Sequence, residues 1–346
     1  HGFTVDPSFM VIPPHKKRLW ADVPLRCLLP RGLDGLLATG LGLSAHRDAL
    51  PVVRMQADVQ NHGYAAGYLA ALSAKTGRAL RDIDVGEVQE HLVQIGNLPE
   101  RVLTDRDSFP VPDDVLREQV TGGWDSLGGV SLILHESERS LPLLREAYDS
   151  LGGQRGPQSL RYAQIMGLLG DAHALDELLG NVGSREWDEG WNFRGMGQFG
   201  MSMSEIDSLL VALGLCGDDR AWDAIFGKIA ALSPESEFSH FRAVSMACES
   251  LHARHPNRQA AARLAGLLDL PGVRGHAMSS LAQIRAVAND DMTDNATRNV
   301  ALREIHLARA LFNCGDHEGR GAEILGQYAR DLRGHFARHA TAVLGA

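Results

Sequence analysis

Residues 36–74 read LLATGLGLSAHRDALPVVRMQADVQNHGYAAGYLAALSA, and this stretch decides the expected fold. A short apolar run ends at Gly40, a loop with glycines and a histidine follows, and then comes a long run crowded with small residues. The order predicts a strand over Leu36–Thr39, a loop, and a helix from about Val53 to Lys75 that Gly77 terminates. Such a strand-loop-helix element is typical of the last part of a nucleotide-binding sheet, with the helix N-terminus pointing at the ligand.

The flanking sequence predicts further local structure. Prolines punctuate residues 1–35, which favours extended segments and turns, with one possible strand over Trp20–Leu29. A second helix is expected over Val85–Gln94, capped by Asp82 or Asp84 and ending at Gly96. Residues 97–115 are polar, proline-bearing and aperiodic, so the domain boundary is placed there, between residues 1–110 and residues 111–346.

An internal repeat marks the rest of the chain. Each copy contains a helix ending, a Gly-Asp pair and a helix beginning, and the pairs begin at residues 170, 217 and 315. Gly is expected to close one helix in the left-handed conformation, and Asp to cap the next helix. A period in the high forties built from helix pairs indicates a HEAT-like α-solenoid, with a degenerate intermediate unit near Leu264–Asp269.

Composition excludes several classes of function. The net charge is −9, and the acidic excess lies beyond residue 110, so a general nucleic-acid-binding surface is not expected. No apolar run is long enough to span a membrane, and the cytoplasm is the default compartment. The four cysteines lack metal-ligand spacing and are expected to be inert thiols, with Cys216 and Cys314 at equivalent packing positions of the repeat.

Three motifs resemble the C-terminal part of the FAD-dependent oxidoreductase family, among the glutathione-reductase-like flavoproteins with two dinucleotide folds. They are DVPLRCLLPRGLDGLLATG at residues 22–40, LSAH at 43–46, and VRMQADVQNHGYAAGYLAAL at 53–72. The resemblance implies a chain that is mainly α: the C-terminal piece of an α/β, Rossmann-like FAD-binding domain, followed by the solenoid. It implies hydride transfer from a hydroxyl- or amine-bearing carbon to flavin.

The same resemblance indicates which residues would contact FAD. A glycine at the strand end lets backbone approach the cofactor, and a helix N-terminus with an arginine favours the negative charge that reduction places on flavin. His46 is the candidate for proton transfer, although it could equally fix the loop or bind a phosphate oxygen. His62 is expected to be a packing or surface residue. The expected cofactor contacts are Gly40, Leu43, Ser44, Ala45, Arg54, Met55 and Gln56.

The glycine fingerprint for the ADP half of FAD is missing from the expected place. GMGQFG at residues 195–200 matches GxGxxG literally, but no strand precedes it, so it is interpreted as a decoy. The chain is therefore expected to need an N-terminal FAD-binding portion, supplied as a companion chain or as a segment not in this sequence. The alternative function is a non-catalytic helical-repeat adaptor.

Residues 185–203 form a second candidate site. Aromatic faces beside paired polar groups are typical of carbohydrate recognition, and Trp187, Asp188, Trp191 and Arg194 are the candidate substrate-binding residues. The competing interpretation is an inter-helix loop whose tryptophans plug the solenoid.

Overall fold

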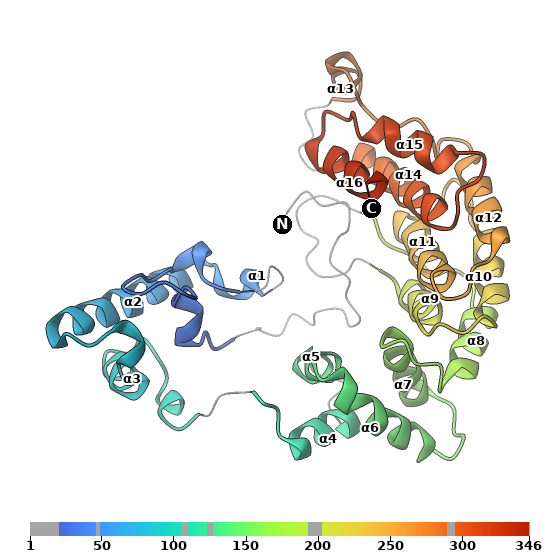
Figure 1. Ribbon diagram of the computed structural model, residues 1–346. Helices are drawn as coiled ribbons and strands as arrows, with labels where there is room; N and C mark the ends of the chain where they lie inside the picture. Colours follow the sequence, from blue (N-terminus) through green and yellow to red (C-terminus); the bar gives the residue numbers. More distant parts are fainter. Residues whose placement is uncertain are drawn as a thin grey trace. The chain divides into compact units, whose positions relative to one another are not determined.

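The computed structural model describes residues 21–45, 49–105, 109–122, 127–192, 203–288 and 295–345. Regular secondary structure in these residues is entirely helical, with no strand and no sheet (Figure 1). The expectation of an α/β, Rossmann-like piece is therefore wrong for the part of the chain that the structure describes. The expectation of a mainly helical chain agrees with it.

Both expected strands are replaced by other local structure. After Pro24, residues Leu25–Leu28 form a 3-10 helix, η1, which cannot present a flat row of donors and acceptors. Residues 36–39 have no regular structure. An isolated backbone hydrogen bond, from Ala38 N to Leu28 O at 2.8 Å, connects them to η1. A strand needs a ladder with a neighbour, and the described residues around 36–39 supply none.

The described chain divides into two compact units, residues 21–111 and residues 112–345, here called the N-terminal unit and the C-terminal unit. The N-terminal unit contains four 3-10 helices and three α-helices. These are η1, η2 (Gly40–Gly42), α1 (Leu50–Val53), α2 (Gln56–Thr76), η3 (Leu80–Asp82), α3 (Val85–Gln94) and η4 (Glu100–Leu103). The expected independence of two domains, with a boundary at residues 110–111, stays a prediction.

Local signals set the ends of α2 and α3. Gly77 adopts φ +68° and closes α2 with its N–H on Ser73 O, as expected for a C-terminal glycine. Asp84, rather than Asp82, caps α3 by accepting a hydrogen bond from Gly86 N at 3.0 Å. The helix expected over Val53–Lys75 begins later than predicted, because the chain breaks between α1 and α2 at Arg54 and Met55.

The C-terminal unit contains the remaining described helices. They are α4 (Asp113–Gly122), α5 (Leu127–His135), α6 (Ser137–Asp149), α7 (Pro157–Leu168), α8 (Leu175–Ser184), α9 (Glu205–Leu215), α10 (Ala221–Ala230), α11 (Phe238–His252), α12 (Arg258–Leu268), α13 (Leu281–Val287), α14 (Ala296–Asn313), α15 (Arg320–Tyr328) and α16 (Gly334–Leu344).

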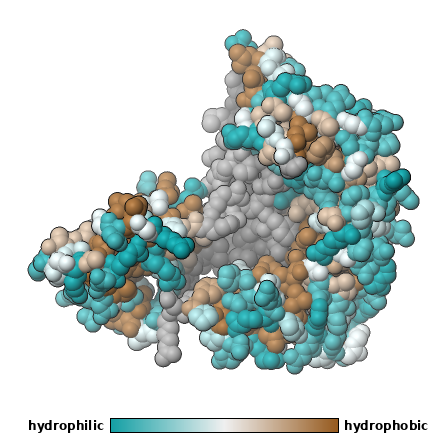
Figure 2. Space-filling view, viewed as in Figure 1, coloured by the Kyte–Doolittle hydropathy of each residue, from teal (hydrophilic) through white to brown (hydrophobic). Residues whose placement is uncertain are grey.

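These helices form two rows. Helices α7, α9, α11 and α14 pack on one another in chain order, while α8, α10 and α12 form a second row against them. Helices α4, α5 and α6 pack together and reach α7 through α6, and α15 and α16 pack on α14. Residues 206–214 of α9 are all buried, since α9 lies between its neighbours in both rows. The outer row, along α10 and α12, presents a mostly hydrophilic surface in Figure 2.

The glycines of the Gly-Asp turns have the expected left-handed conformation, but the expectation that each aspartate caps the next helix is wrong: the N-cap residues of α8, α10 and α15 are Ala174, Arg220 and Gly319. Gly170, Gly217 and Gly315 have φ between +72° and +94°. The aspartate that follows each glycine accepts backbone N–H groups at the start of the next helical segment, for example Arg220 N on Asp218 at 3.0 Å. The turns therefore join α7 to α8, α9 to α10, and α14 to α15.

The intermediate helix pair lies elsewhere than predicted. Residues Leu264–Asp269 form the end of α12, and the turn between α11 and α12 is Ala253–Asn257, with Asn257 capping α12. This turn contacts its predecessors: the His255 ring bonds Gly217 O at 2.9 Å, and a Cβ on Gly170 would lie 3.0 Å from Arg254 Nη2. His252 is the last residue of α11, and its Nδ1 accepts from Asn257 N at 3.2 Å, so both histidines stabilise this turn. Whether the unit belongs to the HEAT class stays a prediction.

Candidate functional site

The segment Gly40–Ala45 folds back on the N-terminal unit. Gly40 is buried with φ +63°, and a Cβ there would lie 3.3 Å from Val59 Cγ1 of α2. Leu43 packs in a core cluster with Leu28, Val53 and Ala66. Ser44 N donates to Cys27 O at 2.8 Å. The structure thus requires glycine at residue 40 for the backbone turn and for packing against α2.

Several hydrogen-bond donors lie at the N-terminus of α2. Its N-cap residue, Met55, cannot accept hydrogen bonds from the first turn, so the N–H groups of residues 56–58 lack a side-chain cap. Arg54 directly precedes it, and Arg54 Nε is buried without a hydrogen-bond partner. Met55 and Gln56 are exposed. Within the part of the chain that the structure describes, donors without a side-chain acceptor therefore lie together at this helix end.

The structure brings most of the expected cofactor contacts into one short region. Gly40 and Leu43 lie against α2, and Arg54, Met55 and Gln56 lie at its start. His46, the candidate for proton transfer, lies outside the described residues. His62 is half-buried on α2, and its Nδ1 is buried without a partner.

One face of α2 is not covered by the described residues of the N-terminal unit. The small residues of this helix were expected to pack against a sheet, but Gly67, Ala70 and Ala71 are exposed, and a Cβ on Gly63 or Gly67 would meet nothing within 4 Å. Large hydrophobic side chains are also exposed across the unit, and Figure 2 shows brown areas on its visible face. They are Leu33, Leu36, Leu41, Met55, Tyr64, Val85, Ile95, Leu103 and Phe109.

In the C-terminal unit, the segment Arg185–Asn192 (the Trp187 segment) is tied to its neighbours. Trp187 Nε1 donates to Lys228 O at 3.3 Å, and Asp188 Oδ2 accepts from Ile206 N at 3.2 Å, at the start of α9. Trp191 is 8% exposed, and its backbone exchanges hydrogen bonds with Ser239. Arg194 and the GMGQFG motif lie outside the described residues. The described contacts of the candidate carbohydrate-binding residues are therefore internal, and sugar binding stays a prediction.

Beneath the Trp187 segment lies a buried polar cluster. Asp207 of α9 is 0% exposed and accepts from His240 Nδ1 at 2.7 Å, from Ser204 N at 2.9 Å, and from Ser239 Oγ at 2.5 Å. Burial opposes ionisation of Asp207, but these donors outweigh it and hold the pKa of that carboxyl below its usual range. Burial likewise disfavours charge on His240, and Asp207 reverses this effect and raises the pKa of the imidazole.

Sequence reasoning missed this cluster. Asp207 and His240 lie far apart along the chain, and no motif joins them. Only one local signal was present: Ser204 and Asp207 form a capping box at the start of α9. Serine, histidine and aspartate gather here, but both Ser239 and His240 bond Asp207 directly. No serine among the described residues of this cluster is therefore placed for activation by the histidine.

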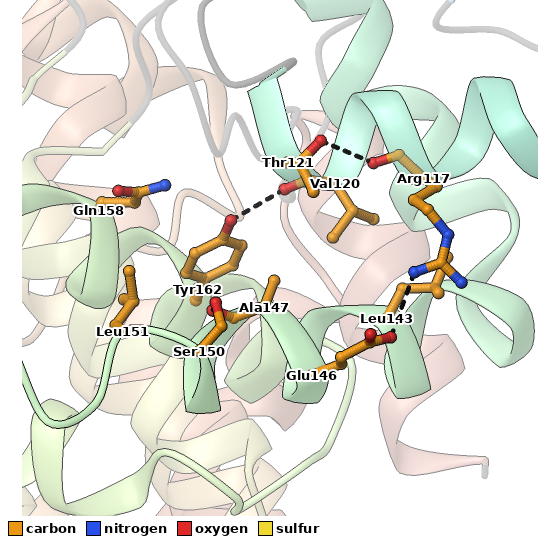
Figure 3. A pocket seen from close by; sticks show the side chains of 10 residues that line it. All are labelled: Arg117, Val120, Thr121, Leu143, Glu146, Ala147, Ser150, Leu151, Gln158 and Tyr162. Atoms are coloured by element: carbon orange, nitrogen blue, oxygen red, sulfur yellow. Dashed lines mark hydrogen bonds and ion pairs between the residues drawn. The ribbon is translucent and has the colours of Figure 1, made fainter.

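A partly open cavity of about 250 Å³ lies between α4, α6 and α7 (Figure 3). Val120, Leu143, Ala147 and Leu151 line it with Tyr162, and most of the polar side chains at its edge have partners. Tyr162 OH donates to Val120 O at 3.1 Å, Thr121 Oγ1 to Arg117 O at 3.0 Å, and Arg117 pairs with Glu146 at 3.2 Å. No convergent set of unpartnered groups from the described residues marks this cavity as a binding site.

The cysteines are free thiols, as expected. Cys216, Cys248 and Cys314 are buried and Cys27 is half-buried. Burial raises the pKa of Cys314 to about 12, which leaves the thiol protonated and unreactive. Among the described residues, no group of His, Cys, Asp and Glu could hold a metal ion, and no helix has the length and apolar character needed to cross a membrane.

A family match covers most of the described N-terminal unit. Residues 11–92 match the FAD dependent oxidoreductase family. The match ends within α3 and includes Gly40, Arg54 and the start of α2, while the C-terminal unit lies outside it. No curated protein and no solved structure matches the chain. The match indicates flavin-dependent oxidoreductase chemistry for this segment, with FAD as the cofactor.

Proposed function

We propose that this chain supplies the redox-end wall of an FAD site in an oxidoreductase that oxidises a polar, hydroxyl-bearing substrate such as a carbohydrate. The observation that carries the proposal is the family match over residues 11–92, together with the uncapped start of α2 inside it. Bound FAD would supply the two-electron acceptor. The C-terminal unit would then be an appended helical domain of the HEAT type.

One observation at the start of α2 supports this cofactor. Arg54 Nε is a buried donor without a partner, beside three backbone N–H groups without a side-chain cap. A flavin ring offers carbonyl and nitrogen acceptors along one edge, and reduction adds negative charge there. Arg54 and the helix dipole would hold that edge and stabilise the charge. His46 would accept the proton of the substrate hydroxyl.

A companion polypeptide or segment is part of the proposal, and exposed apolar surface supports it. Leu41 is 69% exposed and Met55 is 53% exposed, and both lie beside the start of α2. The small residues along α2 would allow close approach of another backbone. We propose that the partner carries the ADP-binding half of the FAD fold and covers this face.

Native isolation of the chain with its bound partners tests the proposal. The purified complex should show the two-band visible absorbance of oxidised flavin and should lose it when a substrate polyol or sugar is oxidised without oxygen. Arg54→Gln should lower flavin retention about tenfold, because a charge-assisted hydrogen bond is lost.

Lys75→Gln is the matched control, since Lys75 is exposed at the opposite end of α2. It should leave flavin retention unchanged. A colourless complex that FAD cannot reconstitute would contradict the flavin assignment and would favour the helical-repeat adaptor instead.

A further inference from the structure

His240 has a hydrogen-bond partner on each ring nitrogen, and both partners are acceptors. Nδ1 lies 2.7 Å from Asp207 Oδ1, and Nε2 lies 3.2 Å from the backbone oxygen of Asp188. A backbone carbonyl has no proton to give. The Asp207 carboxylate accepts two further hydrogen bonds, from Ser239 Oγ and Ser204 N, so it is ionised.

This arrangement fixes the protonation state of the ring. A neutral imidazole carries one N–H, and its other nitrogen presents a lone pair. Either neutral tautomer would therefore point a lone pair at Asp188 O or at the Asp207 carboxylate. Only the imidazolium can make both hydrogen bonds, and the ring is 3% exposed, so water does not substitute readily for either partner.

The two partners belong to different parts of the unit. Asp207 belongs to α9, whereas Asp188 belongs to the Trp187 segment, so the imidazolium joins that segment to α9 and α11. Trp187 lies against the ring, with centroids 4.3 Å apart and the two planes tilted by 34°. Gly190 has φ +64°, and a Cβ there would lie 2.6 Å from His240 Nε2, so the segment approaches the ring as closely as glycine allows.

Other charged groups nearby have separate partners. Lys228 of α10 lies over Trp187, 5.4 Å from the ring centroid, and donates to Arg185 O. Asp188 places its carboxylate on Ile206 N, and Glu237, at the start of α11, accepts from Asn192 Nδ2. Glu186 acts electrostatically on Lys228. Among these described carboxylates, it is Asp207 that bonds the ring of His240.

We propose that His240 and Asp207 form a proton-operated latch: the imidazolium adds a hydrogen bond that holds the Trp187 segment on α9 and α11, and loss of one proton from the ring breaks that bond and loosens the segment. The latch is closed at neutral pH and opens on the alkaline side. Asp207 both opposes proton loss and remains bonded to Nδ1–H after it, so the bond that breaks is the one to Asp188 O.

Ring-nitrogen NMR of the histidine-labelled full chain tests the protonation state. At about pH 7, where an exposed histidine is mostly neutral, the His240 signals should show two protonated nitrogens, and His240→Gln assigns them. A neutral ring at about pH 7 would overturn the proposal, whether or not the variant folds.

Trypsin cleavage after Arg185 reports loosening of the segment. Cleavage after Arg155, in the exposed loop before α7, is the internal control in the same digest. The ratio of the two rates should rise at least tenfold between about pH 7 and about pH 10, in step with the NMR titration. Burial lowers the pKa of Lys228, which also donates to Arg185 O, so Lys228→Met tests whether Lys228 is the titrating group; the transition should persist in this variant. A ratio that stays constant while His240 loses its proton would overturn the latch.

Discussion

At the scale of single residues, Arg254 explains why two of the Gly-Asp turns need glycine for more than backbone conformation. A Cβ on Gly217 would meet the Arg254 side chain, with Cδ at 2.7 Å, and one on Gly170 would lie 3.0 Å from Nη2. Gly319 has the same φ of +72° as Gly217, but a Cβ there would meet nothing within 4 Å.

Comparing Gly217 with Gly319 separates the strain of the left-handed backbone from the clash with Arg254. Gly319→Ala should cost about 1 kcal/mol of unfolding free energy, because only the left-handed conformation is strained. Gly217→Ala should cost about 2 kcal/mol, because Arg254 must also move. Urea unfolding followed by tryptophan fluorescence measures both values. In an Arg254→Ala background the two costs should become equal, and a persistent difference would show that Arg254 is not responsible.

At the scale of helices, glycines also set how closely the inner row packs. A Cβ on Gly214 of α9 would lie 2.7 Å from Ala247 O of α11, and one on Gly167 of α7 would lie 2.8 Å from Ala212 O of α9. Each clash is with backbone, which cannot move without displacing a whole helix. These contacts therefore fix the spacing of α7, α9 and α11.

Gly214→Ala should destabilise the C-terminal unit by about 3 kcal/mol, since two tightly packed helices must separate. Gly227→Ala on α10 is the control, because a Cβ at that residue would meet nothing within 4 Å. It should be neutral or stabilise by up to about 1 kcal/mol through higher helix propensity. Thermal unfolding of the two variants compares them, and equal effects would argue against the close α9–α11 contact.

The same scale shows what the sequence could predict. Helix α3 has the expected bounds, and Gly77 ends α2 as expected, because a cap or a terminal glycine acts on its own helix. The prediction of strands over residues 20–29 and 36–39 was wrong for the described residues. A strand depends on a distant partner strand, which no local pattern reveals. The pairing of Asp207 with His240 escaped prediction for the same reason: it is a tertiary contact between α9 and α11.

At the scale of the whole molecule, buried carboxylates hold loops onto the helical rows. Glu304 of α14 is 1% exposed and accepts from Gly275 N, His276 N and Tyr328 OH, each at 2.8 Å. Asp331 accepts from Met278 N at 2.8 Å and pairs with Arg333 at 2.7 Å. The acidic excess of the chain therefore includes carboxylates with structural partners.

This arrangement predicts how stability depends on pH. Burial opposes ionisation of Asp331, but the Arg333 guanidinium and the Met278 N–H outweigh it and lower the pKa of the carboxyl; donors similarly lower the pKa of Asp207 and of Asp171. A carboxyl whose pKa is lower in the folded state than its unfolded value of about 3.9 stabilises the protein above that pH. Its contribution is lost as the pH falls through the folded value.

The unfolding free energy of the C-terminal unit should therefore fall steeply below about pH 4. Trp187, Trp191 and Trp222 belong to this unit, so fluorescence-monitored urea unfolding at a series of pH values follows it. Asp331→Asn should lower the unfolding free energy at neutral pH. It should also make that free energy fall less steeply below about pH 4, because asparagine binds no proton in either the folded or the unfolded state. Glu323→Gln, at an exposed position on α15, should leave the slope unchanged. If the unfolding free energies of the wild type and of Asp331→Asn fall equally steeply below about pH 4, Asp331 contributes nothing to the pH dependence.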